Sequence, residues 1–322
     1  MATITNVYTT GSAVGIREDL TDSIHRVDVE DTPFMGMAGT AKAKNTIHEW
    51  QTRALSAVDT SNAKPEGQTT SRAASTNNVR LSNVCQISEK NATVSGTLEA
   101  VDKAGRNEEM ALQMADRTIE LRKDMEYALL SNTAYATNAT VDGESGCRTT
   151  RGLEAWIRTN TSRGSGGADP DDPNTTAGTT ATDGTQREFT EELLLDTLQE
   201  VYEAGGNVTT AMLGAYNKRV ASGFVGRSAS TVNVSENKIR QAASLYDSDF
   251  GVIKFVPHRY MRSRNCFLLD PSLVKVAYLR KFVRFPLGKT GDGDTRVILS
   301  EYALEVCNEK GLGIIADLTT SA

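Results

Sequence analysis

The chain has 322 residues, with 41 acidic and 35 basic side chains and a formal net charge of −6 at pH 7. This acidic balance argues against a protein that coats nucleic acid, because such a protein carries a basic surface. The sequence contains no apolar run long enough to span a bilayer, and its first twenty residues lack the basic start and apolar block of a signal peptide.

The beginning of the chain is polar and offers little to bury. Residues 1 to about 30 predict either a flexible tail or an arm that is ordered against another surface. Two strand-like runs follow at 45–52 and 78–95, and the residues 54–77 between them are mainly small and polar. A long hairpin with a polar tip is not stable alone. It therefore lies either on its own domain or against a neighbouring copy, and periodicity does not separate these two alternatives.

Residues 107–132 form the longest uninterrupted helical pattern, and we call this segment the spine helix. We expect Asn107 to cap it and Arg122 to pair with Glu126 one turn later. At about 1.5 Å per residue the helix would be roughly 39 Å long, so other elements must lie along it. Apolar residues recur at helical spacing on one of its faces: Met110, Met114, Leu121, Met125 and Leu129.

The middle of the chain changes character twice. Residues 158–188 are rich in Gly, Thr, Asp and Asn, which predicts a mobile surface loop. Residues 189–204 then predict an amphipathic helix capped by Thr190. Short strand and helix patterns alternate after it, which favours a compact α/β subdomain. These patterns lie at 209–214, 216–224 and 251–256, and a further short strand is predicted at 266–270.

The last third predicts a long strand pair, 273–287 and 295–308, joined by a glycine-rich turn at 288–293. The incoming strand is basic and the returning strand is acidic. If the turn centres near Gly291, Lys281 faces Glu301, and such a cross-strand pair contributes about 0.2–1 kcal/mol.

A search for reactive chemistry finds no convincing constellation. Residues 288–290, Gly-Lys-Thr, match the end of a phosphate-binding loop, but Val283 stands where that motif needs glycine and a strand follows instead of a helix. The sequence has no nucleophile-elbow motif, and neither histidines nor cysteines have metal-ligand spacing. We therefore predict that the protein is not an enzyme and binds no cofactor or metal. We also predict that its cysteines are reduced. The histidines and cysteines of the chain are His25, His48, His258, Cys85, Cys147, Cys266 and Cys307.

Several segments together carry a resemblance to a known family, in the right order and over most of the chain. The chain resembles the major capsid proteins of tailed bacteriophages, and only residues 158–188 lack a recognisable match. The matching segments are DTPF (31–34), HEWQT (48–52), VSGT (94–97), EAVDK (99–103), DME (124–126), LLSN (129–132), GLEAWI (152–157), EAGGN (203–207), SDFG (248–251) and residues 301–318.

The resemblance implies an α+β fold that tailed-phage capsids share with encapsulins and the herpesvirus capsid floor. It implies a structural protein that forms pentamers and hexamers of an icosahedral shell around double-stranded DNA, contacting that DNA only indirectly and no membrane. Scaffolding, portal and decoration proteins are its candidate partners, with assembly in the host bacterial cytoplasm and a final place in the virion capsid. The implied parts are an N-terminal arm (1–39), an extended hairpin loop (40–96), a peripheral domain (97–150 and 273–309) and an axial α/β domain (151–272 and 310–322).

Five residues are predicted to contribute subunit contacts: Trp50, Arg80, Lys281, Arg284 and Glu301. Two other functions stay open from the sequence. One is a different structural protein of the virion, such as a decoration or tail protein. The other is a soluble α/β enzyme that uses His48 or His258 in an unrecognised site.

Overall fold

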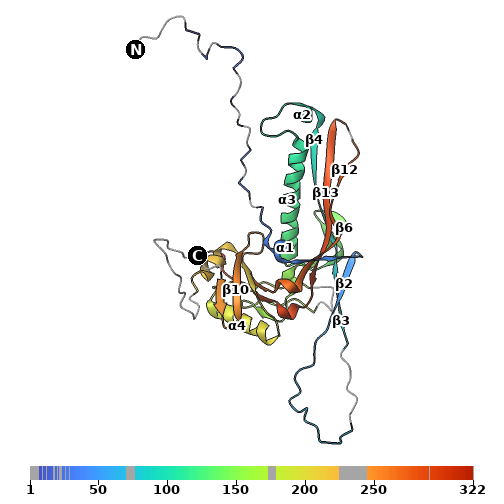
Figure 1. Ribbon diagram of the computed structural model, residues 1–322, viewed down its shortest axis with the longest axis vertical. Helices are drawn as coiled ribbons and strands as arrows, with labels where there is room; N and C mark the ends of the chain where they lie inside the picture. The colour runs from blue at the N-terminus through green and yellow to red at the C-terminus, as the bar shows by residue number, and fades with distance from the viewer. Residues whose placement is uncertain are drawn as a thin grey trace, which may run out of the picture.

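The computed structural model describes residues 7–321 except 9, 12, 17–18, 20, 22–23, 26, 29, 70–76, 173–178, 225–244 and 290. The molecule is elongated (Figure 1). A long helix, α3 (Glu109–Leu130), stands beside a ribbon formed by β12 (Val274–Pro286) and β13 (Gly293–Val306). Below them lies a compact part that holds α4 (Glu191–Glu203) and β10 (Gly251–Pro257).

The ribbon belongs to a four-stranded sheet in the order β1-β12-β13-β4. Here β1 (Gly39–Lys42) runs parallel to β12, and β4 (Gln86–Ser95) runs antiparallel to β13. The spine helix predicted over 107–132 is α3, and all five apolar residues predicted on its inner face are buried. They pack in one core with residues of the sheet such as Ile298 and Tyr302. Helical periodicity therefore predicted this core face correctly.

Two details of α3 differ from the prediction. The residue before the helix is Glu108 and not Asn107, and its side chain makes no capping hydrogen bond. Glu126 is fully buried and accepts hydrogen bonds from residues far away in the sequence, whereas Arg122 donates to Thr32 Oγ1 at 3.2 Å. The expected surface pair between Arg122 and Glu126 is therefore replaced by inward contacts, because the face that carries Glu126 is covered by other elements.

The strand pair is confirmed, but the predicted pairing of Lys281 with Glu301 is wrong. The distal ribbon keeps the register set by the turn, with Val283 opposite Leu299. Nearer the core Arg280 lies opposite Glu301, because β12 accommodates extra residues at an irregularity that includes Phe282 with φ of 36°. Such a bulge adds residues to one strand only, so it moves every later pairing along the chain.

The second sheet has six strands in the order β7-β14-β11-β8-β10-β9. Two of its pairings, β8 with β10 and β7 with β14, are parallel. Thr190 accepts a hydrogen bond from Leu193 N at 3.4 Å and so caps α4 as predicted. The remaining bounds are β7 (Thr161–Ser162), β8 (Thr210–Leu213), α5 (Ala215–Ala221), β9 (Leu245–Ser248), β11 (Cys266–Leu269) and β14 (Gly313–Ile315).

The expectation of a mobile loop at 158–188 needs correction for its described residues, 158–172 and 179–188. Asn160 Nδ2 donates to the backbone oxygens of Lys310 and Leu312 at 2.7 and 2.9 Å. Gly164 N donates to Asp317 Oδ2 at 3.0 Å, and a Cβ at Gly164 would lie 2.0 Å from Thr185 O. The small and polar residues of this segment therefore permit close backbone packing, and low complexity here does not indicate mobility.

The hairpin is formed by β2 (Ile47–Thr52) and β3 (Val79–Val84), which pair antiparallel. It is shorter than the predicted 40–96, because β4 leaves it at Cys85 and joins the four-stranded sheet. No helix in the described part of the chain is sufficiently long and apolar to cross a membrane. The other elements are α1 (Pro33–Met37), α2 (Gly96–Ala100), β5 (Ala136–Val141), β6 (Glu144–Thr149) and short 3-10 helices at Leu153–Ala155, Pro271–Leu273 and Glu309–Gly311.

Candidate subunit-contact surfaces

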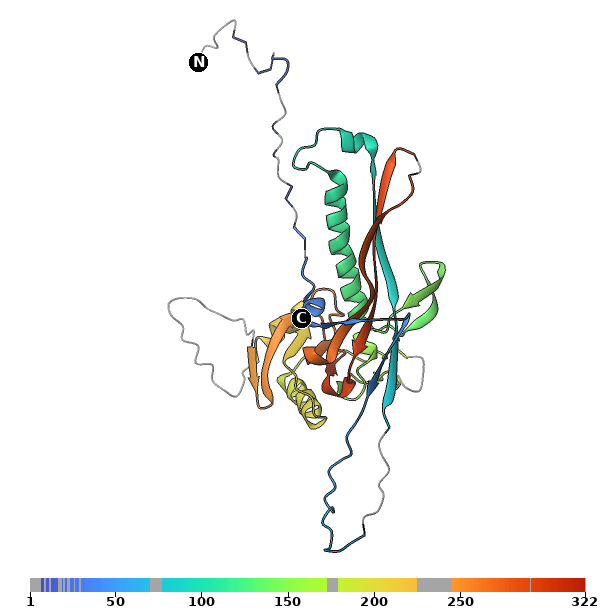
Figure 2. The ribbon, with the colours of Figure 1, turned by 45° about the vertical axis from the view of Figure 1, so that its right-hand side comes forward.

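We define the hairpin tip as residues 53–78, and its described residues extend away from the rest of the molecule (Figure 2). Every one of its residues at 53–69 and 77–78 is exposed. The two largest apolar side chains among them, Leu55 and Val58, are 93% and 91% exposed. Apolar side chains gain free energy when they leave water. The tip therefore carries apolar groups that its own subunit does not bury.

The base of the hairpin, in contrast, is fastened to its own subunit. Trp50 Nε1 donates to Val306 O at 2.8 Å, and its ring lies 5.4 Å from the ring of the fully buried Trp156. His48 Nε2 lies 2.8 Å from Glu305 Oε2 on β13. The structure therefore places Trp50, which was predicted as a subunit contact, at an internal junction that sets the direction of the tip.

Glu305 is the electrostatic centre of this junction. The hydrogen bond from His48 is the main cause that lowers the pKa of Glu305 below its ordinary value of 4.5, and the nearby charge of Lys275 lowers it further against the effect of burial. Lys275 Nζ lies 3.4 Å from Glu305 Oε1. A carboxyl group whose pKa is lower in the folded protein stabilises the fold in its charged form.

We expect this contribution to disappear in acid. It is fully present above pH 4.5 and is lost as the pH falls through the lowered pKa of folded Glu305. The melting temperature of the parent should therefore exceed that of Glu305→Gln most clearly near neutral pH, and the two should converge on acidification. Glu192→Gln, at an exposed position of α4, is the control without such convergence. A difference between parent and Glu305→Gln that stays constant into acid would contradict this role.

Glu301 lies at a second internal junction, inside the four-stranded sheet. Its side chain is buried, with the residue only 4% exposed. It accepts hydrogen bonds from Arg280 Nε at 2.8 Å and from Arg148 on β6. Glu301 therefore joins the β5–β6 hairpin to the ribbon within one subunit.

The other three predicted contact residues lie on the surface. Arg80 pairs with Glu49 across the hairpin, and its side chain is 69% exposed. Lys281 is exposed and places Nζ 5.2 Å from the centre of the Tyr278 ring. Arg284 donates to Thr118 Oγ1 on α3 at 2.9 Å. These three exposed side chains and the half-buried Trp50 remain predicted subunit contacts, whereas Glu301 is buried within its own subunit.

The structure adds a groove that the sequence reasoning missed. It lies between α3 and the distal ribbon, and it has a volume of about 410 Å³. Its lining combines apolar side chains with two arginines and one aspartate: Ala111, Met114, Arg284, Phe285, Pro286, Asp294 and Arg296. The neighbouring outward residues Val283 and Leu287 are also partly exposed apolar side chains. Val283, Phe285 and Leu287 recur at every second position, and this period is the signal that would have indicated an apolar edge.

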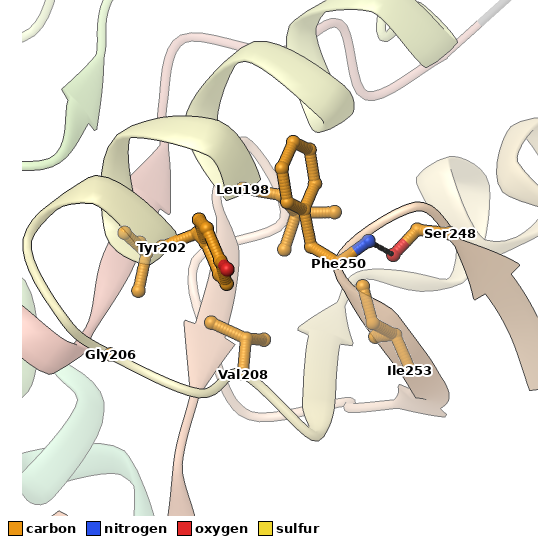
Figure 3. Close-up of a pocket in the computed structure, with 8 residues that line it drawn as sticks. Leu198, Tyr202, Gly206, Val208, Ser248, Phe250 and Ile253 are labelled. Carbon is orange, nitrogen blue, oxygen red and sulfur yellow. Dashed lines mark hydrogen bonds between the residues drawn. The ribbon is translucent and has the colours of Figure 1, made fainter.

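A cavity in the six-stranded region does not offer a ligand site. It lies between α4 and the β9–β10 turn and is lined by Leu198, Tyr202, Val208, Phe250 and Ile253, among others (Figure 3). Its volume of about 10 Å³ leaves room for no more than a water molecule. The hydrogen bond drawn there, from Phe250 N to Ser248 Oγ at 3.3 Å, closes the turn itself. The space is therefore a small packing gap.

The groups that a reactive site would use are dispersed or shielded. All four cysteines are free thiols, and burial raises the pKa of Cys266 to about 12 and is the main cause that raises the pKa of Cys85 to about 11. His48 and His258 are both bound to carboxylates of separate junctions. Within the described residues, no group of three or more His, Cys, Asp or Glu side chains is placed to hold a metal ion.

Comparison with known proteins assigns the chain to a family. A family model described as SU10 major capsid protein matches residues 3–319. The major capsid protein of Escherichia phage Phieco32 is 27% identical over 320 residues, which cover 89% of this chain and 90% of that protein.

Solved structures show the same fold at low sequence identity. The capsid of a native GTA particle has a TM-score of 0.63 at 8% identity and covers 96% of this chain and 98% of its own. The capsid asymmetric unit of cyanophage A-1(L) has a TM-score of 0.60 at 13% identity, and the match covers 98% of this chain and 100% of that chain. The predicted α+β capsid fold is thereby confirmed. Because the family model spans almost the entire chain, the protein belongs to the SU10 major capsid protein family.

Proposed function

We propose that this major capsid protein assembles with copies of itself into pentamers and hexamers, which close an icosahedral shell around packaged double-stranded DNA. The observation that carries the proposal is the hairpin tip, whose described residues are all exposed although it includes Leu55 and Val58. A segment of this kind gains its burial from a neighbour. Repeated contacts of modest size become strong together, because each subunit that joins a ring makes several at once.

The N-terminal arm supports the same proposal. Tyr8, Val14 and Ile16 are exposed apolar residues of the arm, and the described residues in the first part of the arm lie away from the rest of the subunit (Figure 1). We infer that the arm also contacts another copy. The groove between α3 and the distal ribbon is a receiving surface of suitable character, since Met114, Phe285 and other apolar side chains line it beside its charged groups.

The division into an arm, an extended loop, a peripheral domain and an axial domain is part of this proposal. The four-stranded sheet with α3 would form most of the peripheral domain, and the six-stranded sheet with α4 most of the axial one. The proposed partners beyond other copies are scaffolding, portal and decoration proteins, with assembly in the host cytoplasm. A net charge of −6 fits a shell that encloses DNA without binding it tightly, since phosphate contacts require basic groups.

The proposal is tested by the assembly state of the purified protein. Light scattering and electron microscopy should detect closed shells or rings of five and six subunits. A chain that remains monomeric under all assembly conditions would overturn the proposal. The number of copies per particle distinguishes a shell protein from a decoration or tail protein, because the shell protein must be the most abundant protein of the particle.

A further inference from the structure

Glu126, near the C-terminal end of α3, lies at a junction of three parts of the chain. The side chain is completely buried. Its Oε1 accepts a hydrogen bond from Phe34 N at 2.7 Å, and its Oε2 accepts one from Met35 N at 2.9 Å, both in α1 at the root of the N-terminal arm. The same Oε1 lies 2.7 Å from His258 Nε2, just beyond β10 of the six-stranded sheet. One carboxylate of the spine helix α3 thus contacts both the arm root and the residue that follows β10 of the six-stranded sheet.

The hydrogen bonds of His258 define where its proton lies. Nδ1 is within 3.1 Å of Tyr260 N and 3.0 Å of Met261 N, and both of these backbone groups donate to it. Nδ1 is therefore an acceptor without a proton, and Nε2 carries the proton that is donated to Glu126. A neutral imidazole in this tautomer fixes the turn after β10 with one nitrogen and the carboxylate with the other.

Two further polar contacts hold the arm root to α3. Arg122 donates to Thr32 Oγ1 at 3.2 Å, and Lys123 Nζ lies 3.7 Å from Asp28 Oδ1. On the side of the second sheet a cavity of about 420 Å³ lies between these parts. It is lined by Asp31, Pro33, Ala215, Pro257, His258 and Arg259. Side-chain packing leaves this space open, and Glu126 provides a hydrogen-bonded connection between His258, beside the six-stranded sheet, and the arm root.

We propose that Glu126 is a positioning residue that couples the direction of the N-terminal arm to the orientation of the six-stranded sheet relative to α3. A movement of β10 that withdraws His258 leaves a buried carboxylate with fewer donors, and an unpaired buried charge is costly. The carboxylate must then turn, and its bonds to the arm root are strained or lost. This rests on the proposed function, in which one sequence occupies non-equivalent positions of a shell and its arms must adapt.

Two substitutions at His258 separate the coupling from a merely structural effect. His258→Gln keeps a donor near the position of Nε2 and removes the acceptor for Tyr260 and Met261, whereas His258→Asn keeps that acceptor and removes the donor to Glu126. The measurement is hydrogen–deuterium exchange of the Phe34 and Met35 amides in the full chain. We expect exchange to rise about tenfold or more in His258→Asn and to stay within about threefold of the parent in His258→Gln, because only the first loses the bond to Glu126.

The remaining variants make the outcome unambiguous. Glu126→Gln has only one terminal oxygen that accepts a hydrogen bond, so it should also accelerate exchange at Met35. Glu120→Gln, at a half-buried position of α3 that is paired with Arg117, should not. Amides of β13 report whether a variant has unfolded globally. Equal exchange in the two His258 variants, or an unchanged Met35 amide in Glu126→Gln, would overturn the proposal. Exchange is measured within one subunit, so failure of shell assembly bears on the proposed function and not on this coupling.

Discussion

Replacement of residues 55–76 by an Asn-Gly turn is expected to abolish shell assembly and to leave the subunit folded. The ladder between β2 and β3 ends with Thr52 opposite Val79, so residues 54 and 77 are suitably placed to flank a two-residue hairpin turn. The base retains the hydrogen bond of Trp50 and the His48–Glu305 pair, and the described residues removed are all exposed. We expect a change in the free energy of unfolding of less than about 1 kcal/mol, as for other exposed changes.

The measurements are thermal melting for the subunit and electron microscopy for the shells. The matched control changes the exposed β5–β6 hairpin instead. Asp142 has φ of 52° and precedes Gly143 with φ of 84°, so Asp142→Asn retains a residue that tolerates this left-handed conformation. The control should assemble like the parent. Normal shells from the shortened variant would show that the tip supplies no essential contact.

Glu301→Lys is expected to have the largest effect of a single substitution on the stability of the subunit. The change places a third positive charge against Arg148 and Arg280 at a position that is only 4% exposed. Removing one partner from a buried ion pair costs about 3–5 kcal/mol. We expect a loss of at least this size in the free energy of unfolding, measured by chemical denaturation, together with the loss of assembly.

Glu49→Lys is the matched control for this prediction. It reverses the same kind of charge beside Arg80, but this pair is exposed on the hairpin. Exposed ion pairs contribute about 0–1 kcal/mol, so the control should remain close to the parent in stability. If Glu301→Lys proved no more destabilising than Glu49→Lys, the buried junction at Glu301 would have no special role.

The elements of this fold could be predicted from the sequence where the pattern is local and long. Met110, Met114 and Leu121 recur with helical period and are indeed buried in α3. The ribbon was recognised from its two strands and its glycine-rich turn. The register of the ribbon could not be predicted, because the bulge around Phe282 leaves no periodic signal in the sequence.

Polar residues were the main source of error. Glu126 has the spacing of an ordinary surface pair with Arg122, yet it is buried by segments more than 90 residues away in sequence. The segment 158–188 has the composition of a loop, but Asn160 and Gly164 bind the body of the subunit. Both cases depend on long-range contacts that one sequence does not reveal.

The predicted contact residues differ in how far they are exposed. Arg80, Lys281 and Arg284 lie on the surface, as residues that meet a neighbour must. Trp50 is half-buried and Glu301 is buried, and both donate to or accept from groups of their own subunit. The groove near Phe285 and Met114 was missed because it is formed by two elements that meet only in the folded chain.

A density map of assembled particles by cryo-electron microscopy tests the central claim most directly. The account predicts closed shells in which residues 53–78 of every subunit lie on the body of an adjacent subunit, with Leu55 and Val58 buried at the contact. A map in which this hairpin tip folds back onto its own subunit, or stays in solvent between subunits that are joined elsewhere, would contradict it.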